Sequence, residues 1–271
     1  EYRILRALAD SNVPHPAVRA VCAEPSVLGA TFYLMDFVDG WSPISESHWP
    51  EPFDSDPGAR RGLAFELVDA IARLSRVDWK ARGLEGLGRP DGFHDRQVDR
   101  WYAHLRQFEF RKIPGLDDAG DWLRGHRPRN YQPGIMHGDY QFANVMFHHG
   151  GPARLAAIVD WEMGTVGDPL LDLAWVVMGW PDEGEVRTGG YVDYTGMPNR
   201  DDLLDHYATV SGRDVDDIDY YVVLARFKLA IVLEGGYARY VAGRADNPRM
   251  EAFGGVVLDL AARAAELVRT I

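Results

Sequence analysis

The chain has 271 residues, of which 46% are hydrophobic and 26% are charged, so it is long enough to bury a sizeable core. Its 41 acidic residues outnumber its 29 basic ones, and the net charge of −12 disfavours binding to nucleic acid or to an anionic membrane. The single cysteine excludes an intramolecular disulfide, and with no signal peptide and no apolar run of membrane-spanning length the sequence predicts a cytoplasmic protein.

The first quarter of the chain predicts one helix end and two strands. Apolar residues at helical spacing favour a helix over residues 1–9, and strands are expected at 18–23 and 31–38. The loop from Gly40 to Gly58 contains four prolines, which neither helices nor central strands tolerate well. We therefore expect residues 1–40 to form a partial N-terminal lobe that includes the second strand.

The remainder, residues 41–271, predicts a mostly helical C-terminal lobe. Short strands are expected at 145–147 and 155–159, joined by a turn with two glycines and a proline. Helices are expected at 59–76, 94–110, 116–125, from Pro169 to about 178, 200–211, 216–241 and 248–269. Asp168 before Pro169 is typical of a helix N-cap. The predicted class is α+β, with a small N-terminal strand pair and a helix followed by a mostly helical lobe.

Three polar residues have a spacing that points to phosphoryl transfer. Asp139 lies two residues after His137, Asn144 lies five residues after Asp139, and Asp160 follows 21 residues after Asp139. This spacing matches the kinase signature H-R-D-L-x-x-x-N followed by D-F-G, with Gly138 in place of the arginine. Such a set provides a base for the acceptor hydroxyl and oxygen ligands for Mg²⁺.

Each of these residues is given a role and has a plainer alternative. Asp139 is predicted to be the catalytic base, although a Gly-Asp pair also makes ordinary turns. Asn144 and Asp160 are predicted to bind Mg²⁺. Asp160 follows an apolar strand, where a buried carboxylate needs a partner, and a metal would be one; the alternative is an exposed aspartate at a strand end. Glu162 is equally compatible with a second metal, a cationic acceptor or a solvated loop.

The His-Gly-Asp form of the motif resembles the aminoglycoside phosphotransferase family, whose members are kinase-like and phosphorylate small molecules. Residues 32–40 (FYLMDFVDG) look like the fifth strand and hinge of that family, and 167–174 (GDPLLDLA) look like the helix after its metal-binding aspartate. The sequences EYRIL at 1–5, DWEM at 160–163 and GYAR at 236–239 are closest to a subgroup whose members are also fused to acyl-CoA dehydrogenases.

The resemblance implies a two-lobe kinase-like fold that binds ATP or GTP with Mg²⁺ and transfers a phosphoryl group to a small-molecule hydroxyl. It implies that the Asp36 carbonyl and the Val38 amide contact the nucleotide base, with Met35 on the pocket wall. It also implies that His137 is structural, bracing its loop through backbone hydrogen bonds. Asp172 is expected to pair with an arginine or with amides of the catalytic loop.

One part of the family pattern does not appear in this sequence. A kinase-like fold has a glycine-rich loop and a strand lysine that pairs with a helix glutamate. Glu1 stands where that glutamate is expected, and the lysines, at 80, 112 and 228, all lie beyond the hinge. We expect a segment before Glu1 to be missing from this sequence. The alternative is a true absence, which would make the protein a pseudokinase or nucleotide-binding module without turnover.

The acceptor is left open between two classes. An aminoglycoside-like acceptor needs clustered carboxylates, whereas a hydroxyacyl-CoA-like acceptor needs arginine or lysine near the cleft. The candidate carboxylates are Asp182, Glu183, Glu185, Asp201, Asp202 and Asp205, and the candidate arginines are Arg226 and Arg239. A third function, a metal-dependent hydrolase, would draw on His148 and His149 together with His137 and Asp139. Adjacent histidines on a strand point to opposite faces, so we expect these two to lie on the surface.

Overall fold

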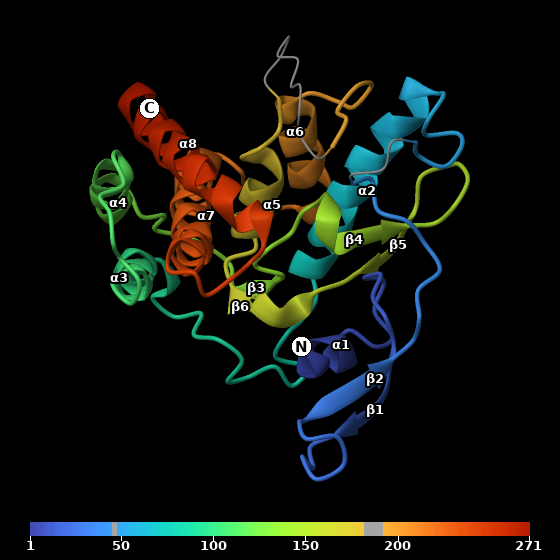
Figure 1. The fold of residues 1–271 in the computed structure, drawn as a ribbon. Coiled ribbons are helices and arrows are strands. Elements are labelled where there is room, and N and C mark those ends of the chain that lie inside the picture. Colours follow the sequence, from blue (N-terminus) through green and yellow to red (C-terminus); the bar gives the residue numbers. More distant parts are fainter. Residues whose placement is uncertain (45–47, 182–191) are drawn as a thin grey trace. The chain divides into compact units, whose positions relative to one another are not determined.

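The computed structural model describes residues 1–44, 48–181 and 192–271 (Figure 1). Within these ranges helices predominate, and the strands form three separate antiparallel pairs. This mixture confirms the predicted α+β class. A search of the same ranges finds no helix with the length and apolar character needed to cross a membrane.

The chain divides into two compact units, and each unit is made from two stretches of sequence. Unit 1 comprises residues 1–89 and 133–215, and unit 2 comprises residues 90–132 and 216–271. The lobe boundary predicted near residue 40 falls inside unit 1, and a division at that residue remains a prediction.

Unit 1 contains the strands and the segment that carries the Asp139 motif. Its helices and 3-10 turns are Tyr2–Ala7 (α1), Pro57–Ser75 (α2), Phe142–Asn144 (η1), Trp161–Met163 (η2), Leu170–Val177 (α5) and Arg200–Ser211 (α6). Its strands are Val18–Cys22 (β1), Phe32–Met35 (β2), Gly134–Met136 (β3), Val145–Phe147 (β4), Leu155–Ile158 (β5) and Thr165–Gly167 (β6). They pair as β1–β2, β3–β6 and β4–β5. The loop that joins β3 to β4, residues 137–144, is called the motif loop below, and it therefore connects two different small sheets.

Helix α2 anchors unit 1 through its apolar face. The side chain of Asp56 accepts a hydrogen bond from the Gly58 amide at 2.8 Å, and Pro57 occupies the first turn, where a missing N–H costs nothing. Its buried side chains include Leu63, Leu67, Ile71 and Leu74, the four that the sequence placed on one face. This face packs against β3, β5, α5 and α6.

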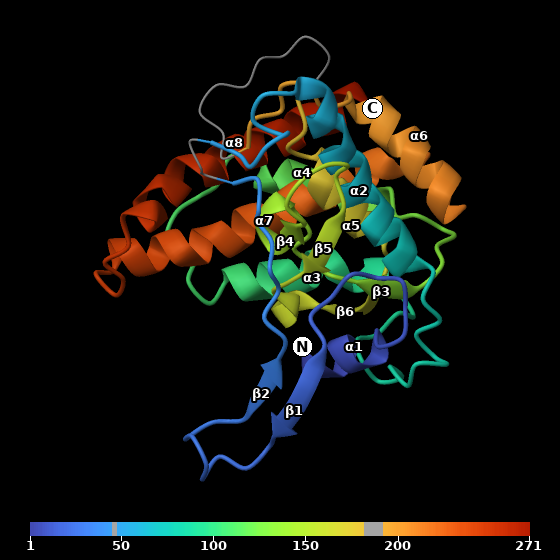
Figure 2. The same cartoon turned by 90° about the vertical axis from the view of Figure 1, so that its right-hand side faces the viewer.

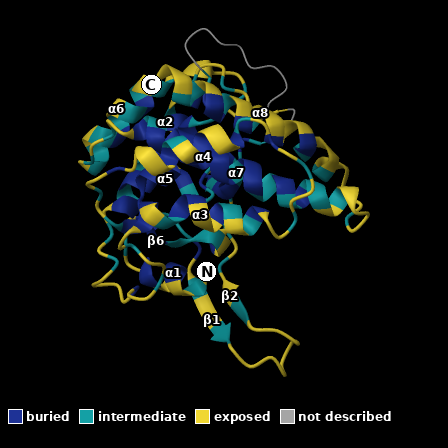
Figure 3. Ribbon diagram, turned by 90° about the vertical axis from the view of Figure 1, so that its left-hand side faces the viewer, coloured by how far each residue is buried: buried dark blue, intermediate teal, exposed yellow. Residues whose placement is uncertain are grey.

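Helix α5 is buried along its whole length. All eight residues of Leu170–Val177 are buried, as Figure 3 shows by its dark colour. The Asp168 side chain accepts a hydrogen bond from the Leu170 amide at 3.2 Å, but Pro169 is the N-cap residue of α5, so the prediction of Asp168 as N-cap was wrong by one position. A carboxylate on such a helix must find donors within the protein, because its desolvation is otherwise uncompensated. Asp172 is that carboxylate.

Unit 2 consists of helices Phe93–Leu105 (α3), Leu116–Gly125 (α4), Ile218–Val241 (α7) and Pro248–Thr270 (α8). Helices α7 and α8 lie side by side (Figure 2). Arg111 donates to both oxygens of the buried Glu234 at 2.8 and 2.6 Å and to the Gly254 carbonyl at 3.1 Å. This bidentate pair joins the segment between α3 and α4 to both long helices.

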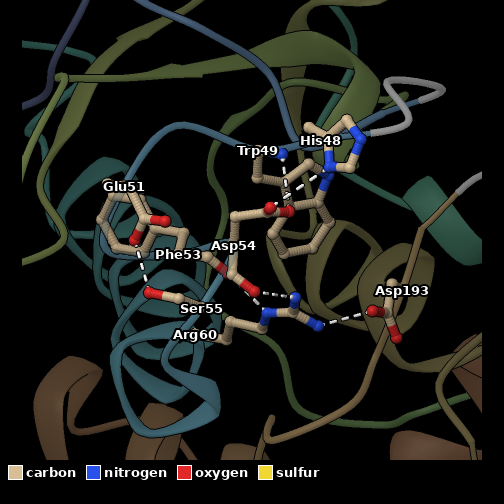
Figure 4. A network of polar contacts seen from close by, with 8 residues as sticks. All are labelled: His48, Trp49, Glu51, Phe53, Asp54, Ser55, Arg60 and Asp193. Atoms are coloured by element: carbon tan, nitrogen blue, oxygen red, sulfur yellow. Dashed lines mark hydrogen bonds and ion pairs between the residues drawn. The ribbon is translucent and has the colours of Figure 1, made fainter.

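A buried arginine connects three segments at the start of α2 (Figure 4). Arg60 is 9% exposed, and it donates to the carbonyls of Phe53 and Asp54 at 2.6 and 3.0 Å. It also forms an ion pair with Asp193 at 2.5 Å and lies over the Trp49 ring, 4.8 Å from its centroid. Arg60 therefore ties the loop before α2 and the segment that follows residue 191 to the helix itself.

Replacing Arg60 by alanine should destabilise the protein by about 3 kcal/mol, because two carbonyls and one carboxylate lose their donor. The neighbouring Arg61 provides a matched control, since its ion pair with Asp202 is exposed at both partners. Arg61→Ala should cost less than about 1 kcal/mol. Urea unfolding of both variants measures the difference, and equal losses would show that the Arg60 network contributes no special stability.

Candidate active site

A buried carboxylate, that of Asp172, holds the backbone of the motif loop in place. Asp172, which is 1% exposed, accepts hydrogen bonds from the backbone amides of His137 and Gly138 at 2.6 and 2.8 Å. The pairing with catalytic-loop amides is one of the two partners that the sequence analysis expected for Asp172. Gly138 has a φ of +87°, and a Cβ there would lie 2.6 Å from the Met163 carbonyl oxygen, so only glycine fits.

His137 braces the same loop from the inside. Its Nε2 donates to the Val159 carbonyl at 2.8 Å, which leaves Nδ1 to accept the Asp139 amide at 3.3 Å. The ring lies 4.9 Å from the Trp161 ring, and Trp161 is itself 1% exposed. These contacts agree with a structural role for His137, because both ring nitrogens are engaged by the backbone.

Tyr140 attaches the loop to helix α2. Its hydroxyl donates to the Leu67 carbonyl at 2.8 Å. Complete burial, reinforced by nearby carboxylates, raises the pKa of Tyr140 well above its usual value, so the hydroxyl stays protonated and remains a donor. The residues on both sides of Asp139 are thus attached to helices, with His137 and Gly138 bonded to α5 and Tyr140 bonded to α2.

The structure brings Asp139 and Asn144 into direct contact. The Asn144 amide nitrogen donates to the Asp139 carbonyl at 2.8 Å and to its Oδ2 at 3.0 Å. A carboxylate only accepts hydrogen bonds, so the nitrogen of Asn144 must face Asp139 and its oxygen must point elsewhere. That oxygen is the atom that a metal ion would need.

Gln141 is a member of this site that the sequence analysis missed. Its side-chain nitrogen donates to Asp139 Oδ1 at 2.9 Å, so each oxygen of the carboxylate accepts an amide hydrogen bond. The kinase spacing assigns no role to this position, and a neutral amide carries no sign of function by itself. The only feature of the sequence that could have pointed to Gln141 is its position two residues after Asp139, the expected base.

Asp160 lies beyond β5 in a strained and exposed position. Its φ and ψ are 61° and 62°, a left-handed conformation that costs a non-glycine residue roughly 1–3 kcal/mol. The expectation that burial would force this carboxylate to take a partner is wrong, because Asp160 is exposed. The Val159 amide donates to the Asn144 carbonyl at 2.9 Å, so the chain just before Asp160 is tied to Asn144.

The predicted hinge follows β2. The Asp36 amide donates to the Ala17 carbonyl at 2.9 Å, and Arg19 donates twice to the Asp36 carboxylate, both times at 2.5 Å. The Arg19 hydrogen bonds lower the pKa of Asp36. Met35 is 49% exposed and Val38 is half-buried. The Asp36 amide and carboxylate are thus engaged within the sheet, and the roles of the three hinge residues stay predictions.

Glu1 and Asp160 approach the same tyrosine. The Tyr33 hydroxyl donates to the Glu1 carboxylate at 3.2 Å. Burial first, then Glu1 and finally the charge of Asp160 raise the pKa of Tyr33. Glu1 therefore contacts Tyr33 directly, whereas Asp160 affects this tyrosine only through its charge.

The remaining candidates are dispersed. Asp182, Glu183 and Glu185 lie outside the described residues. Asp201 and Asp205 are exposed on α6, where Asp202 pairs with Arg61. In unit 2, Arg226 donates to the Arg263 carbonyl at 3.2 Å and Arg239 is exposed. His148 and His149 are exposed, and across the described ranges no three His, Cys, Asp or Glu side chains gather as a metal site would need.

Charge is distributed very unevenly between the units. Unit 1 carries 26 of the 41 acidic residues and 14 of the 29 basic ones, so it holds the whole net charge of −12 and unit 2 is neutral. An anionic nucleotide meets repulsion from such a unit unless a cation accompanies it. The exposed carboxylate of Asp160 and the amide oxygen of Asn144 are hard oxygen ligands that fit Mg²⁺.

Replacing Asp172 by alanine should destabilise the protein by about 3 kcal/mol, because two buried amides lose a charged acceptor. Asp172→Asn keeps the shape but only one accepting oxygen, so it should cost roughly half as much. Urea unfolding of the two variants gives the ranking. A loss below about 1 kcal/mol for the alanine variant would contradict the anchoring role of Asp172.

Comparison with known proteins places these features in a family. A profile of the phosphotransferase enzyme family matches residues 1–204. Acyl-CoA dehydrogenase family member 11 from chicken is 30% identical over all of this chain, which spans 35% of that protein's length. A candidate aminoglycoside phosphotransferase from Ralstonia eutropha has 31% identity and a TM-score of 0.86, over 99% of this chain and 82% of that one.

A more distant structure shows the fold alone. The aminoglycoside phosphotransferase APH(4)-Ia, solved with ADP and hygromycin B, is 12% identical with a TM-score of 0.64 and covers 98% of this chain and 82% of its own. The expected resemblance is confirmed, including the relation to proteins that carry an acyl-CoA dehydrogenase name. The chain therefore belongs to the phosphotransferase enzyme family and has its kinase-like fold.

Proposed function

We propose that this protein transfers the γ-phosphoryl group of ATP or GTP to a hydroxyl group of a small molecule, with Mg²⁺ as cofactor. The observation that carries the proposal is the arrangement around Asp139. Both of its carboxylate oxygens accept amide hydrogen bonds, and the oxygen of one of those amides, that of Asn144, is turned away. Family membership supports phosphoryl transfer to a small molecule in general.

Asp139 is the proposed base. The acceptor hydroxyl forms a bond to the γ-phosphorus while the bond from that phosphorus to the β-bridging oxygen breaks and the nucleoside diphosphate leaves. The hydroxyl proton passes to the Asp139 carboxylate. This residue is half-buried on a loop held by Asp172 and Tyr140, so its orientation is fixed before substrate arrives.

Asn144 and Asp160 are the proposed metal ligands. Mg²⁺ bound there would neutralise phosphate charge and orient the γ-phosphoryl group. Asn144 directs its amide oxygen away from Asp139. Asp160 is exposed and has a strained backbone, and such strain occurs at sites where ligand binding offsets its cost in free energy. Glu1, which accepts a hydrogen bond from Tyr33, and the hinge residues Met35, Asp36 and Val38 would contribute to nucleotide binding, with the hinge receiving the base.

The acceptor remains a choice between two classes. Relatives with an acyl-CoA dehydrogenase name favour a hydroxyacyl-CoA-like compound, whereas the two solved structures described above are named for aminoglycosides. A nucleotide-binding module without turnover is the second candidate function. One observation favours it: the carboxylate of Glu1, which a kinase-like site uses to pair with a lysine, accepts a hydrogen bond from the Tyr33 hydroxyl.

The Asp139→Ala variant of the full-length protein should lower kcat by about 10²–10⁴, because a positioned base is lost while nucleotide binding is retained. The assay measures ADP release with Mg²⁺-ATP and either kanamycin or 3-hydroxybutyryl-CoA. Asp118→Ala, an exposed aspartate of α4, is the control and should keep full activity. Unchanged kcat in the Asp139 variant would exclude the proposed mechanism.

The metal site has its own test in a thermal shift with Mg²⁺ and ATP. A ligand at about a hundredfold excess over its Kd stabilises the native state by roughly 2.7 kcal/mol. We expect a Mg²⁺-dependent rise in Tm for the native protein and its loss in Asp160→Ala. Asp10 is the matched control, since it is the other described non-glycine residue with a positive φ, also 61°. If Asp10→Ala removed the rise as well, backbone strain rather than metal binding would explain both.

A further inference from the structure

Gln141 is the residue of the site whose role neither the motif spacing nor the family match supplies. It is half-buried and extended, with φ of −161° and ψ of 171°, immediately before the 3-10 turn η1. Its carbonyl accepts the Asn144 amide at 2.9 Å, and its side-chain nitrogen donates to Asp139 Oδ1 at 2.9 Å. One residue thus contacts both the proposed base and the proposed metal ligand, by different atoms.

The side-chain contact restricts rotation of the Asp139 carboxylate. The carboxyl torsion of an aspartate is broad, so a carboxylate held at one oxygen still turns about its last bond. Asn144 holds only Oδ2, and Gln141 holds Oδ1. With both oxygens engaged by donors on the same loop, the carboxylate plane is defined, and so are the lone pairs that remain to take a proton.

The neutral charge of Gln141 matters to this role. A lysine or arginine would also donate to Asp139, but it would compete with the acceptor for the carboxylate as a full ion pair. An amide donates without a net charge and leaves the carboxylate as the only charged partner in the contact.

We infer that Gln141 is a positioning residue for the transfer step, acting by fixing the plane of the Asp139 carboxylate toward the acceptor hydroxyl. This inference rests on the proposed function. It assigns a role to the Gln141 side chain through its hydrogen bond to Asp139. Its loss should lower kcat and leave the KM for ATP unchanged.

The test is a double-mutant cycle in the full-length protein with Gln141→Leu and Asp139→Ala. Leucine has a similar size but no donor, and the main-chain bond to Asn144 persists. In the native background, Gln141→Leu should lower kcat about tenfold to a hundredfold, as expected for a hydrogen bond to a charged group. In the Asp139→Ala background it should change the residual rate less than about twofold, because its partner is already gone.

The readout is ADP release with Mg²⁺-ATP and kanamycin or 3-hydroxybutyryl-CoA, with transfer to water as the basal reaction. An equal loss from Gln141→Leu in both backgrounds would overturn the inference, since Gln141 would then act on the nucleotide or on folding. No loss in the native background would also overturn it. The proposed function fails separately, if Asp139→Ala alone leaves kcat unchanged.

A second variant separates the loss of the hydrogen-bond donor from any change in side-chain packing. Gln141→Glu preserves shape but replaces the donor by a like charge beside Asp139, so it should lower kcat at least as much as leucine does. The thermal midpoint of Gln141→Leu should match that of the native protein, because the side chain is only half-buried. Activity retained in Gln141→Glu would contradict a donor role.

Discussion

The two hydrogen bonds from the His137 and Gly138 amides to the Asp172 carboxylate are the contact on which the rest of the site depends. Asp172 is buried on a helix with no exposed residue, so its charge has few donors to choose from. Two consecutive amides that point to one carboxylate fix the backbone path just before Asp139. The left-handed conformation of Gly138 follows from that path, and the nearby Met163 carbonyl leaves no room for a side chain.

Further hydrogen bonds connect the loop held by Asp172 to the segments that carry Asn144 and Asp160. His137 reaches the Val159 carbonyl with its ring, and the Val159 amide returns to the Asn144 carbonyl. These bonds place the turn that carries Asp160 beside the turn that carries Asn144, although 16 residues separate them in sequence. Catalysis by positioning needs this kind of rigidity, because an error of about 1 Å in a reacting group costs about a hundredfold in rate.

The contact between Asp139 and Asn144 could be expected because the two residues lie close together in sequence. The amphipathic face of α2 is also a local pattern, whereas a carboxylate in an apolar helix left the partner of Asp172 open between an arginine and loop amides. The pairing of β3 with β6 was missed because each strand has only three residues and shows no alternation. The Arg60 network was missed because Arg60 and Asp193 are 133 positions apart.

Asp160 shows how an apolar run can predict the wrong surroundings for a residue. The apolar run before it suggested burial, but the chain turns into a left-handed conformation there and exposes the carboxylate. Gln141 shows the opposite case, since its role depends on a side-chain contact that spacing alone does not reveal. The sequence also does not reveal that two stretches distant along the chain combine into each compact unit.

The central claim is that one loop, held by Asp172, presents a base and a metal ligand to the same phosphoryl group. The most direct measurement is a crystal structure of the full-length protein with Mg²⁺ and a non-hydrolysable ATP analogue. The account predicts a metal ion bound by the Asn144 amide oxygen and the Asp160 carboxylate, with the γ-phosphate facing Asp139. A nucleotide bound elsewhere, or a metal that bypasses both residues, would contradict it.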